Sequence, residues 1–296
     1  MDKNLYSFAG DVAAQLVMKA TTARKDGSYI NDDGIGFKDL DYMIAGLQRG
    51  NLIIVGGRPA MGKTAFALSI ASNLAIHKKR NVVFFSVELS KEAVVSRIIA
   101  TKSQIDFTHF RTGQLSDEEW NRLCKCAEEL GKSRLIVDDT PKITIDEICD
   151  RCLQLKELKS VDIVLVDYLQ IVSAGQKAES RQLEVEYIVR KLKKLAKEIN
   201  VPILVMSQLS RAIEQRSDKH PMLSDFRETS AIEQEADTVM FIYRDDYYCK
   251  DSKYRGLAEI MVEKNRTGNL GSVYLEWDSK KYEFRDLDGM LPSETG

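Results

Sequence analysis

The sequence of 296 residues is poor in proline, in cysteine and in long hydrophobic runs. Its 5 Pro and 17 Gly form no long tract, which excludes collagen-like chains and extended disorder. No hydrophobic run approaches the ~20 residues of a membrane-spanning helix, and residues 1–25 lack the pattern of a secretory signal. Five Cys, an odd number, fit a reducing compartment better than a disulfide framework. We therefore expect a cytoplasmic protein with no membrane partner.

An excess of charge of either sign is also missing. The chain has 43 Lys and Arg against 45 Asp and Glu, a formal net charge of −2. This balance excludes a histone-like polycation and argues against nucleic-acid binding through bulk charge, but it leaves room for a local basic lining. With 44% hydrophobic and 30% charged residues, the composition is that of a globular protein. The length allows one large domain or two modest ones.

From residue 52 onward, short apolar runs alternate with helical patterns. Continuous hydrophobicity over a few residues is typical of strands that are buried on both faces of a parallel sheet. The runs cover 52–55, 82–87, 135–137, 161–166, 201–206 and 238–243. Helical patterns cover 116–130, 144–158 and 181–199, and residues 258–263 and 272–278 resemble antiparallel strands added near the end. The alternation predicts an α/β fold with a mainly parallel, twisted sheet and flanking helices.

The first part of the chain has a different character. Residues 11–24 predict one amphipathic helix, and the Gly-, Asp- and Asn-rich stretch 26–36 predicts a linker. We therefore divide the chain into a linker helix and linker segment, 1–33, and a main domain, 34–296. Because the helix has little core of its own, we expect it to dock on another surface, such as a neighbouring subunit.

The most specific motif is Gly57-Arg58-Pro59-Ala60-Met61-Gly62-Lys63-Thr64, which fits the phosphate-loop pattern G-x-x-x-x-G-K-[ST]. It follows an apolar run and precedes a helical stretch that starts at Ala65. Backbone N–H groups of such a loop, with the positive end of the helix dipole, cradle phosphates. Lys63 would add a charge on the β- and γ-phosphates, and Thr64 an oxygen ligand for Mg²⁺. Residues 57–65 therefore predict a nucleotide site.

Three other apolar runs end in polar side chains that suit this chemistry. Asp167 could be a second Mg²⁺ ligand, Glu88 could polarise the attacking water, and Gln208 could sense the γ-phosphate. Each has a plainer alternative. Asp167 could cap the following turn, and Glu88 could cap a helix. Ser207 could take the place of Gln208 as the residue that contacts the phosphate.

Two further features have weaker signals. Lys264 and Arg266 follow a predicted strand and could supply cations to a neighbour's site, although spacing alone favours a solvated basic turn. The long polar stretches 173–182 and 207–237 follow strands on the nucleotide side. They are either plain surface loops or contacts for the phosphates of a single nucleic-acid strand.

Five segments together resemble one family. They read GGRPAMGKTAFALSIASNLA (56–75), FFSVELS (84–90), VDYLQIV (166–172), SQLSRAIEQRSDKHPMLSDFRETSAIEQEADTVMFIYRDDYY (207–248) and EKNRTG (263–268). They are similar to the C-terminal ATPase domain of DnaB-type replicative DNA helicases, over about residues 27–285. The segment 207–248 separates this family from other RecA-like ATPases.

The resemblance implies a RecA-like P-loop NTPase core that binds ATP and Mg²⁺. It also implies a hexameric ring with ATP sites between subunits, single-stranded DNA in the central channel, and 5′-to-3′ unwinding of duplex DNA. Primase and a helicase loader are possible partners. A recombination ATPase of RecA or RadA type, or a DNA-binding ATP switch without unwinding, stays as the alternative.

The resemblance also assigns residues to roles. Lys63 and Thr64 match the Walker A positions, Asp167 the Walker B position, Glu88 the catalytic carboxylate and Gln208 the sensor. Lys264 and Arg266 match a paired basic finger that enters the neighbour's site, which reverses the expectation from spacing. The resemblance implies DNA contacts in two channel loops, at Arg227, Glu228 and Ser230 in one and at Gln176 and Arg181 in the other.

One departure from the family concerns the start of the chain. Members carry a helical N-terminal domain before the linker, and residues 1–33 match the linker region alone. The resemblance therefore implies either an excised domain or a natural short form, and it leaves ring closure open.

Overall fold

The computed structural model describes residues 8–26, 34–158, 160–175, 178–226 and 230–292. Its centre is a nine-stranded sheet with the order β3-β2-β4-β5-β1-β6-β7-β8-β9. The first six strands in this order are parallel, and β7, β8 and β9 add antiparallel to one edge. The strands are β1 Leu52–Gly57, β2 Val82–Ser86, β3 Leu135–Asp138, β4 Ile163–Asp167, β5 Ile203–Gln208, β6 Thr238–Tyr243, β7 Leu257–Asn265, β8 Gly271–Asp278 and β9 Glu283–Asp286.

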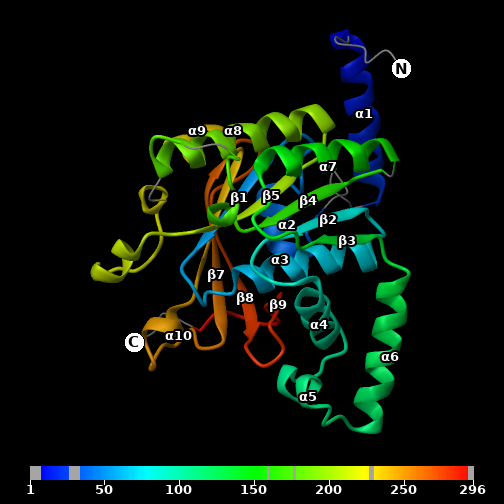
Figure 1. Ribbon diagram of the computed structural model, residues 1–296, viewed down its shortest axis with the longest axis vertical. Coiled ribbons are helices and arrows are strands. Elements are labelled where there is room, and N and C mark those ends of the chain that lie inside the picture. The colour runs from blue at the N-terminus through cyan, green and yellow to red at the C-terminus, as the bar shows by residue number, and fades with distance from the viewer. Residues whose placement is uncertain (1–7, 27–33, 159, 176–177, 227–229, 293–296) are drawn as a thin grey trace.

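Helices cover both faces of the sheet, with α7 and α8 on one side and α3 and α4 on the other (Figure 1). The α-helices are α1 Ala9–Asp26, α2 Lys38–Ile44, α3 Lys63–Ser72, α4 Lys91–Lys102, α5 Phe107–Thr112, α6 Asp117–Gly131, α7 Ile145–Leu158, α8 Arg181–Ile199, α9 Ser230–Glu235 and α10 Asp245–Tyr248. A π-helical turn, Asn73–His77, follows α3, and short 3₁₀ helices span Leu169–Ile171, Arg211–Gln215 and Leu223–Asp225.

The predicted α/β architecture is confirmed, down to the antiparallel strands near the end. β6 matches its predicted run residue for residue, whereas β4 and β5 begin two residues later than predicted. The expectation that 207–237 is one long polar loop is wrong. This stretch contains two 3₁₀ helices and α9, because Ile213, Phe226 and Ile232 are buried and anchor it to the sheet.

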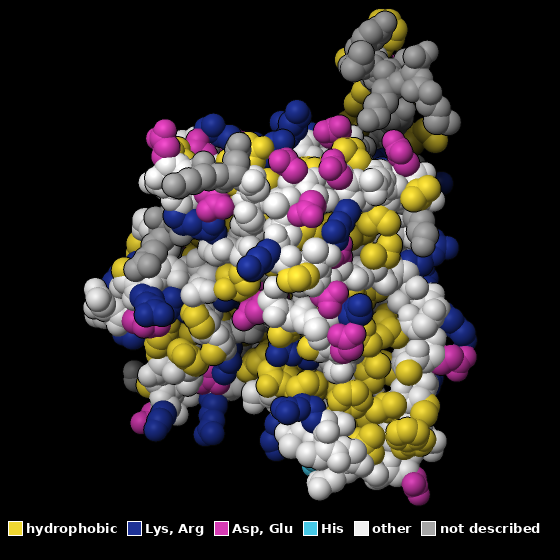
Figure 2. Space-filling model, in the orientation of Figure 1, with side chains coloured by type: hydrophobic (Ala, Val, Ile, Leu, Met, Phe, Trp, Pro, Cys, Tyr) yellow, Lys and Arg dark blue, Asp and Glu magenta, His cyan; other side chains and the backbone are white. Residues whose placement is uncertain are grey.

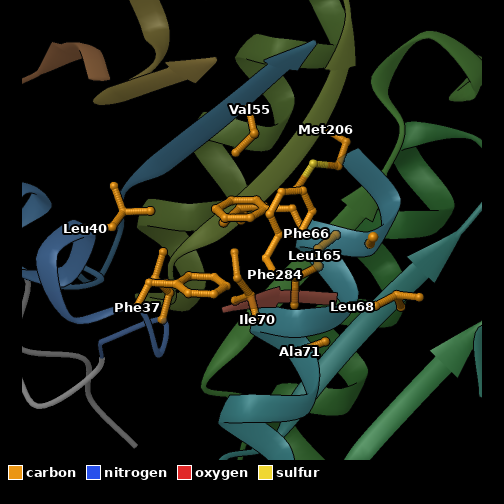
Figure 3. Packing of buried hydrophobic residues seen from close by; sticks show 14 of the residues in the cluster. Phe37, Leu40, Val55, Phe66, Leu68, Ile70, Ala71, Leu165, Met206 and Phe284 are labelled. Carbon is orange, nitrogen blue, oxygen red and sulfur yellow. The ribbon is translucent and has the colours of Figure 1, made fainter. Parts of the chain in front are cut away.

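The core on the α3 side brings the last strands over the start of that helix. The ring of Phe66 in α3 stacks on Phe37, with 5.4 Å between centroids, and meets Phe284 of β9 edge to face at 5.6 Å. Figure 3 shows these rings beside one another. The contact explains how the β8–β9 hairpin, at the far edge of the sheet, comes to lie next to the phosphate loop.

The predicted helix over 11–24 lies within α1, which projects from the rest of the molecule (Figure 1). Among the described residues of α1 only Ala23 is buried, and large apolar side chains such as Leu16, Val17 and Met18 are exposed. Acidic and basic side chains are interspersed over the face in Figure 2, as the charge balance suggests. Within the described parts of the chain, no helix combines the length and hydropathy needed to cross a membrane.

Candidate nucleotide-binding site

Four neighbouring strands bring their carboxyl ends to the same edge of the sheet. In spatial order they are β2, β4, β5 and β1, and they end next to Glu88, at Asp167, at Gln208 and at the phosphate loop. Ser86 pairs with Asp167, and Gly57 pairs with Gln208, so the ends lie at one level. Their side chains line one cavity of about 330 Å³. Such an edge is where open α/β sheets bind ligands.

The phosphate loop has the backbone shape that its glycines allow. Gly62 has a φ of 98°, and a Cβ there would lie 2.8 Å from the ring of Phe284, so glycine alone fits this position. Helix α3 begins at Lys63, directly after this turn. Pro59, Ala60 and Ala65 also line the cavity. The free N–H groups at the start of α3 therefore face a space suited to phosphate.

Lys63 is folded back onto its own loop. Its Nζ donates hydrogen bonds to the carbonyl oxygens of Gly57, at 2.9 Å, and Arg58, at 3.1 Å. Burial lowers the pKa of Lys63 to about 8, against the opposing effect of the carboxylates of Asp167 and Glu88. A phosphate in the cavity would supply the negative charge that this buried ammonium needs.

Asp167 and Thr64 form a pair that suits a divalent cation. The carboxylate of Asp167 is buried, and burial raises its pKa to about 6, although a hydrogen bond from Thr64 and the charge of Lys63 oppose the rise. Its Oδ1 has no hydrogen-bond partner among the residues that the structure describes. A buried carboxylate oxygen that lacks a donor, next to a hydroxyl, fits Mg²⁺, which prefers hard oxygen ligands.

Glu88 and Gln208 line the same cavity, and Glu88, two residues after the end of β2, is exposed. The backbone of Gln208 is held by Gln170, whose side-chain oxygen accepts from the Gln208 N–H at 3.0 Å. The Gln170 amide also donates to the hydroxyl of Ser207 at 3.0 Å. Ser207 is fully buried, so the structure favours Gln208 over Ser207 as the residue that faces a ligand.

Four side chains of the cavity were not predicted from the sequence. They are Arg97 of α4, Tyr168 directly after β4, Trp277 of β8 and Tyr282 of the β8–β9 turn. The Arg97 guanidinium lies 5.2 Å from the centroid of the Tyr282 ring, within the range of a cation–π contact. Spacing carries no signal for Arg97, Trp277 and Tyr282, because Arg97 reaches the cavity from α4 and the other two only through the fold of the last hairpin over α3.

Lys264 and Arg266 lie away from this cavity. In β7, Lys264 pairs with Val239 at the start of β6, and the neighbouring Thr238 pairs with Ile53 at the start of β1. The phosphate loop follows the other end of β1, about 13 Å further at ~3.3 Å per residue. Arg266 pairs with Asp237, and Lys264 donates to the carbonyl oxygen of Glu233. The structure therefore does not bring the two cations into the site of their own chain.

Of the predicted DNA contacts, Gln176, Arg227 and Glu228 lie outside the described residues, and Ser230 begins α9. Arg181 is the first residue of α8. Its guanidinium donates to the carbonyl oxygen of Gln170 at 2.7 Å and pairs with Glu184 at 2.5 Å. These bonds fix Arg181 against the 3₁₀ helix Leu169–Ile171 that follows β4.

The family model described as "DnaB-like helicase C terminal domain" matches residues 34–286. The chain belongs to the DnaB-like helicases. It is 44% identical to the replicative DNA helicase DnaB of Geobacillus stearothermophilus over 254 residues, which cover 86% of this chain and 56% of the relative. It is 36% identical to the replicative DNA helicase DnaB of Rickettsia typhi over 315 residues, covering 97% of this chain and 63% of the relative.

Solved structures of DnaB-like proteins share the fold. One solved ATPase domain superposes with a TM-score of 0.86 at 33% identity, covering 96% of this chain and all of that domain. A DnaB-like replicative helicase, studied with its primase interactions, gives the same TM-score and identity over 68% of its chain. The fold is RecA-like, as the resemblance implied. Both sets of matches support the helicase interpretation over a recombination ATPase, and the chain spans little more than half the length of the curated relatives it matches.

Proposed function

We propose that this chain is the ATPase motor of a DnaB-type replicative DNA helicase, which hydrolyses ATP to move along single-stranded DNA and unwind duplex. The main support is one observation. The phosphate loop, Glu88, Asp167 and Gln208 come from four adjacent strands and meet in a single cavity in a chain of this family.

The cavity supplies a group for each part of the reaction. Lys63 and the N–H groups at the start of α3 bind the β- and γ-phosphates. Thr64 and Asp167 hold Mg²⁺, which when bound neutralises charge on the phosphate oxygens. Glu88 accepts a proton as water attacks the γ-phosphorus, and the bond to the bridging oxygen of ADP breaks. Gln208 reports on the γ-phosphate through a hydrogen bond.

We further propose that the reaction is completed between copies of the chain. Lys264 and Arg266 lie at the end of the sheet opposite their own phosphate loop, so they can stabilise the transferring phosphoryl group only in a neighbour. The exposed apolar side chains of α1, among them Leu16, Val17 and Met18, suit docking on the adjacent copy. A ring of six copies follows from the family resemblance.

In that ring, single-stranded DNA passes through the centre, against the segments that carry Gln176 with Arg181 and Arg227 with Glu228 and Ser230. A few positive groups per subunit, repeated around a channel, are compatible with a net charge of −2. Primase is a proposed partner because one similar helicase was solved with its primase interactions, and a helicase loader is a second.

ATP hydrolysis by the 296-residue chain, measured with and without Mg²⁺ and a single-stranded oligonucleotide, tests this function. We expect Mg²⁺-dependent turnover that rises with DNA, and light scattering should show a multimer with an ATP analogue present. Turnover without any response to DNA would favour an ATP switch. Strand exchange with a homologous duplex, in place of unwinding, would favour the recombination ATPase.

A further inference from the structure

Arg58, inside the phosphate loop, is bonded to a segment that follows β5. Its guanidinium is buried, and Nε and Nη2 donate to Oε1 of Glu214 at 3.0 and 2.6 Å. Its Nη1 donates to the carbonyl oxygen of Leu209 at 2.8 Å. Glu214 lies in the 3₁₀ helix Arg211–Gln215 and is half exposed. Arg58, a residue of the phosphate loop, therefore binds the chain after β5 at two positions, Leu209 and Glu214.

The same part of the phosphate loop holds the ammonium of Lys63. The carbonyl oxygens of Gly57 and Arg58 accept from Lys63 Nζ, and the Gly57 oxygen also accepts from the N–H of Leu209 at 3.3 Å. A phosphate that binds Lys63 draws the ammonium away from both carbonyls. The peptide groups that lose this donor are the ones that carry Arg58 and contact Leu209.

The segment 210–225, which contains Glu214, is held together by hydrogen bonds between its two ends. The two Nη atoms of Arg216 donate to the carboxylate of Asp225 at 2.9 and 3.0 Å, and the N–H of Ser210 donates to the carbonyl oxygen of Asp225 at 3.0 Å. These bonds join residues 210 and 225, so the segment 210–225 is one unit and Glu214 is its ionic attachment to the phosphate loop. Residue 225 comes just before the Arg227–Ser230 stretch of the proposed DNA contacts.

We propose that Arg58 is a positioning residue that, through Glu214, couples phosphate occupancy at Lys63 to the placement of the segment 210–225. The inference rests on the proposed function, because it assumes that ATP and DNA are the two ligands. The coupling is reciprocal. A buried guanidinium depends on its carboxylate partner, so a DNA strand that shifts the segment also shifts Arg58 and the loop around the phosphates.

The test removes the attachment and leaves the nucleotide site intact. Glu214→Ala truncates a half-exposed side chain outside the cavity, whereas Glu214→Gln keeps an acceptor oxygen without the charge. For each variant of the full chain, ATP hydrolysis is measured with and without a single-stranded oligonucleotide, together with the Tm. We expect Glu214→Ala to lower the Tm, because the buried Arg58 loses its carboxylate partner, but to keep the basal rate and to lose the stimulation by DNA by about fivefold or more. Glu214→Gln should fall between Glu214→Ala and the wild type.

Glu186→Ala is the matched control, because it breaks another Glu–Arg pair of 2.6 Å, with Arg190 on α8, and should keep the wild-type stimulation. The proposal is overturned if Glu214→Ala is stimulated like the wild type, or if its basal and stimulated rates fall in the same proportion. It is also overturned if the control loses stimulation equally. If the wild type itself hydrolyses no ATP, or ignores DNA, the proposed function fails first, and that result is distinct from the others.

Discussion

Arg266 forms an ion pair with Asp237, with 3.2 Å between Nη1 and Oδ1, at the end of the sheet opposite Lys63. Asp237 also accepts from the buried Lys193 at 2.5 Å, so the carboxylate is shared and Arg266 is held at a surface with half of its side chain exposed. A cation fixed in this way is available to a neighbouring molecule and out of reach of its own phosphate loop.

Complementation between two inactive variants follows from this placement. Arg266→Ala should lose ATP turnover because the neighbour's site lacks its cation, and Lys63→Ala should lose it because its own phosphate site is damaged. In a mixture, some interfaces join an intact phosphate loop to an intact Arg266. We expect the mixture to recover part of the ATPase activity, measured at fixed total protein. A mixture that stays inactive although both variants assemble would show that Arg266 does not act in a neighbour.

Glu88→Gln should separate binding from turnover. The amide keeps the shape and hydrogen-bonding reach of Glu88 but cannot accept the proton of the attacking water. We expect the rate of hydrolysis to fall by ~10²–10⁴-fold, while the Kd for a fluorescent ATP analogue stays near that of the wild type. Undiminished turnover would remove Glu88 from its proposed role as the base.

Asp167→Asn should make the protein more stable and inactive. Burial raises the pKa of Asp167 to about 6, so above that pH folding without a bound cation carries the cost of a buried negative charge. Replacing the carboxylate with an amide should raise the free energy of unfolding by ~1–3 kcal/mol at neutral pH. This gain should shrink as the pH falls from about 6 towards 4, and it should be gone below about 4, where Asp167 is protonated in both the folded and the unfolded protein. Mg²⁺-dependent hydrolysis should be lost because a metal ligand is lost.

Asp138→Asn is the matched control for this effect. Burial acts to raise the pKa of Asp138, but hydrogen bonds from Arg151 and Thr140 outweigh it and hold the pKa below its ordinary value. The same substitution there should lower stability at neutral pH. Equal signs for the two variants in urea unfolding would contradict the electrostatic explanation.

A pH dependence should arise at His220. Hydrogen bonds to Glu259 and Asp218 raise the pKa of His220 to about 9, against the effect of burial. Because the folded pKa lies above the unfolded value of about 6.5, the stabilisation is complete below pH ~6.5 and is lost as the pH rises through about 9. The side chain is 42% exposed, so solvent screening should keep the effect below ~2 kcal/mol.

His220→Gln is the comparison for this prediction, since an amide does not titrate. The difference in unfolding free energy between wild type and His220→Gln should be larger at about pH 6 than at about pH 10. A difference that stays constant with pH would show that the imidazolium adds nothing to stability.

The strands and the main site residues could be predicted because their signals are local. Strands buried on both faces read as continuous apolar runs, and Glu88, Asp167 and Gln208 each stand where such a run ends. The order of the strands decides that these ends are neighbours, and it depends on pairing between distant segments. The sequence pattern predicted a ligand-binding edge of the sheet. The register of Ser86 with Asp167 shows that the carboxyl ends of β2 and β4 lie at the same level of that edge.

Contacts between distant residues explain what was missed. Trp277 and Tyr282 reach the cavity because Phe284 packs on Phe66 across 218 positions of chain. Arg58 and Glu214 are separated by 156 positions. No periodicity relates such residues, so their contacts become visible only in the folded molecule.

Unwinding of a forked DNA duplex with a 5′ single-stranded tail tests the central claim most directly. The account predicts that the wild-type chain separates the strands when ATP and Mg²⁺ are present, and that Lys63→Ala does not. A non-hydrolysable ATP analogue should also give no unwinding. Strand separation that survives Lys63→Ala, or DNA-stimulated ATP hydrolysis that yields no separation, would contradict the assignment of this chain as a helicase motor.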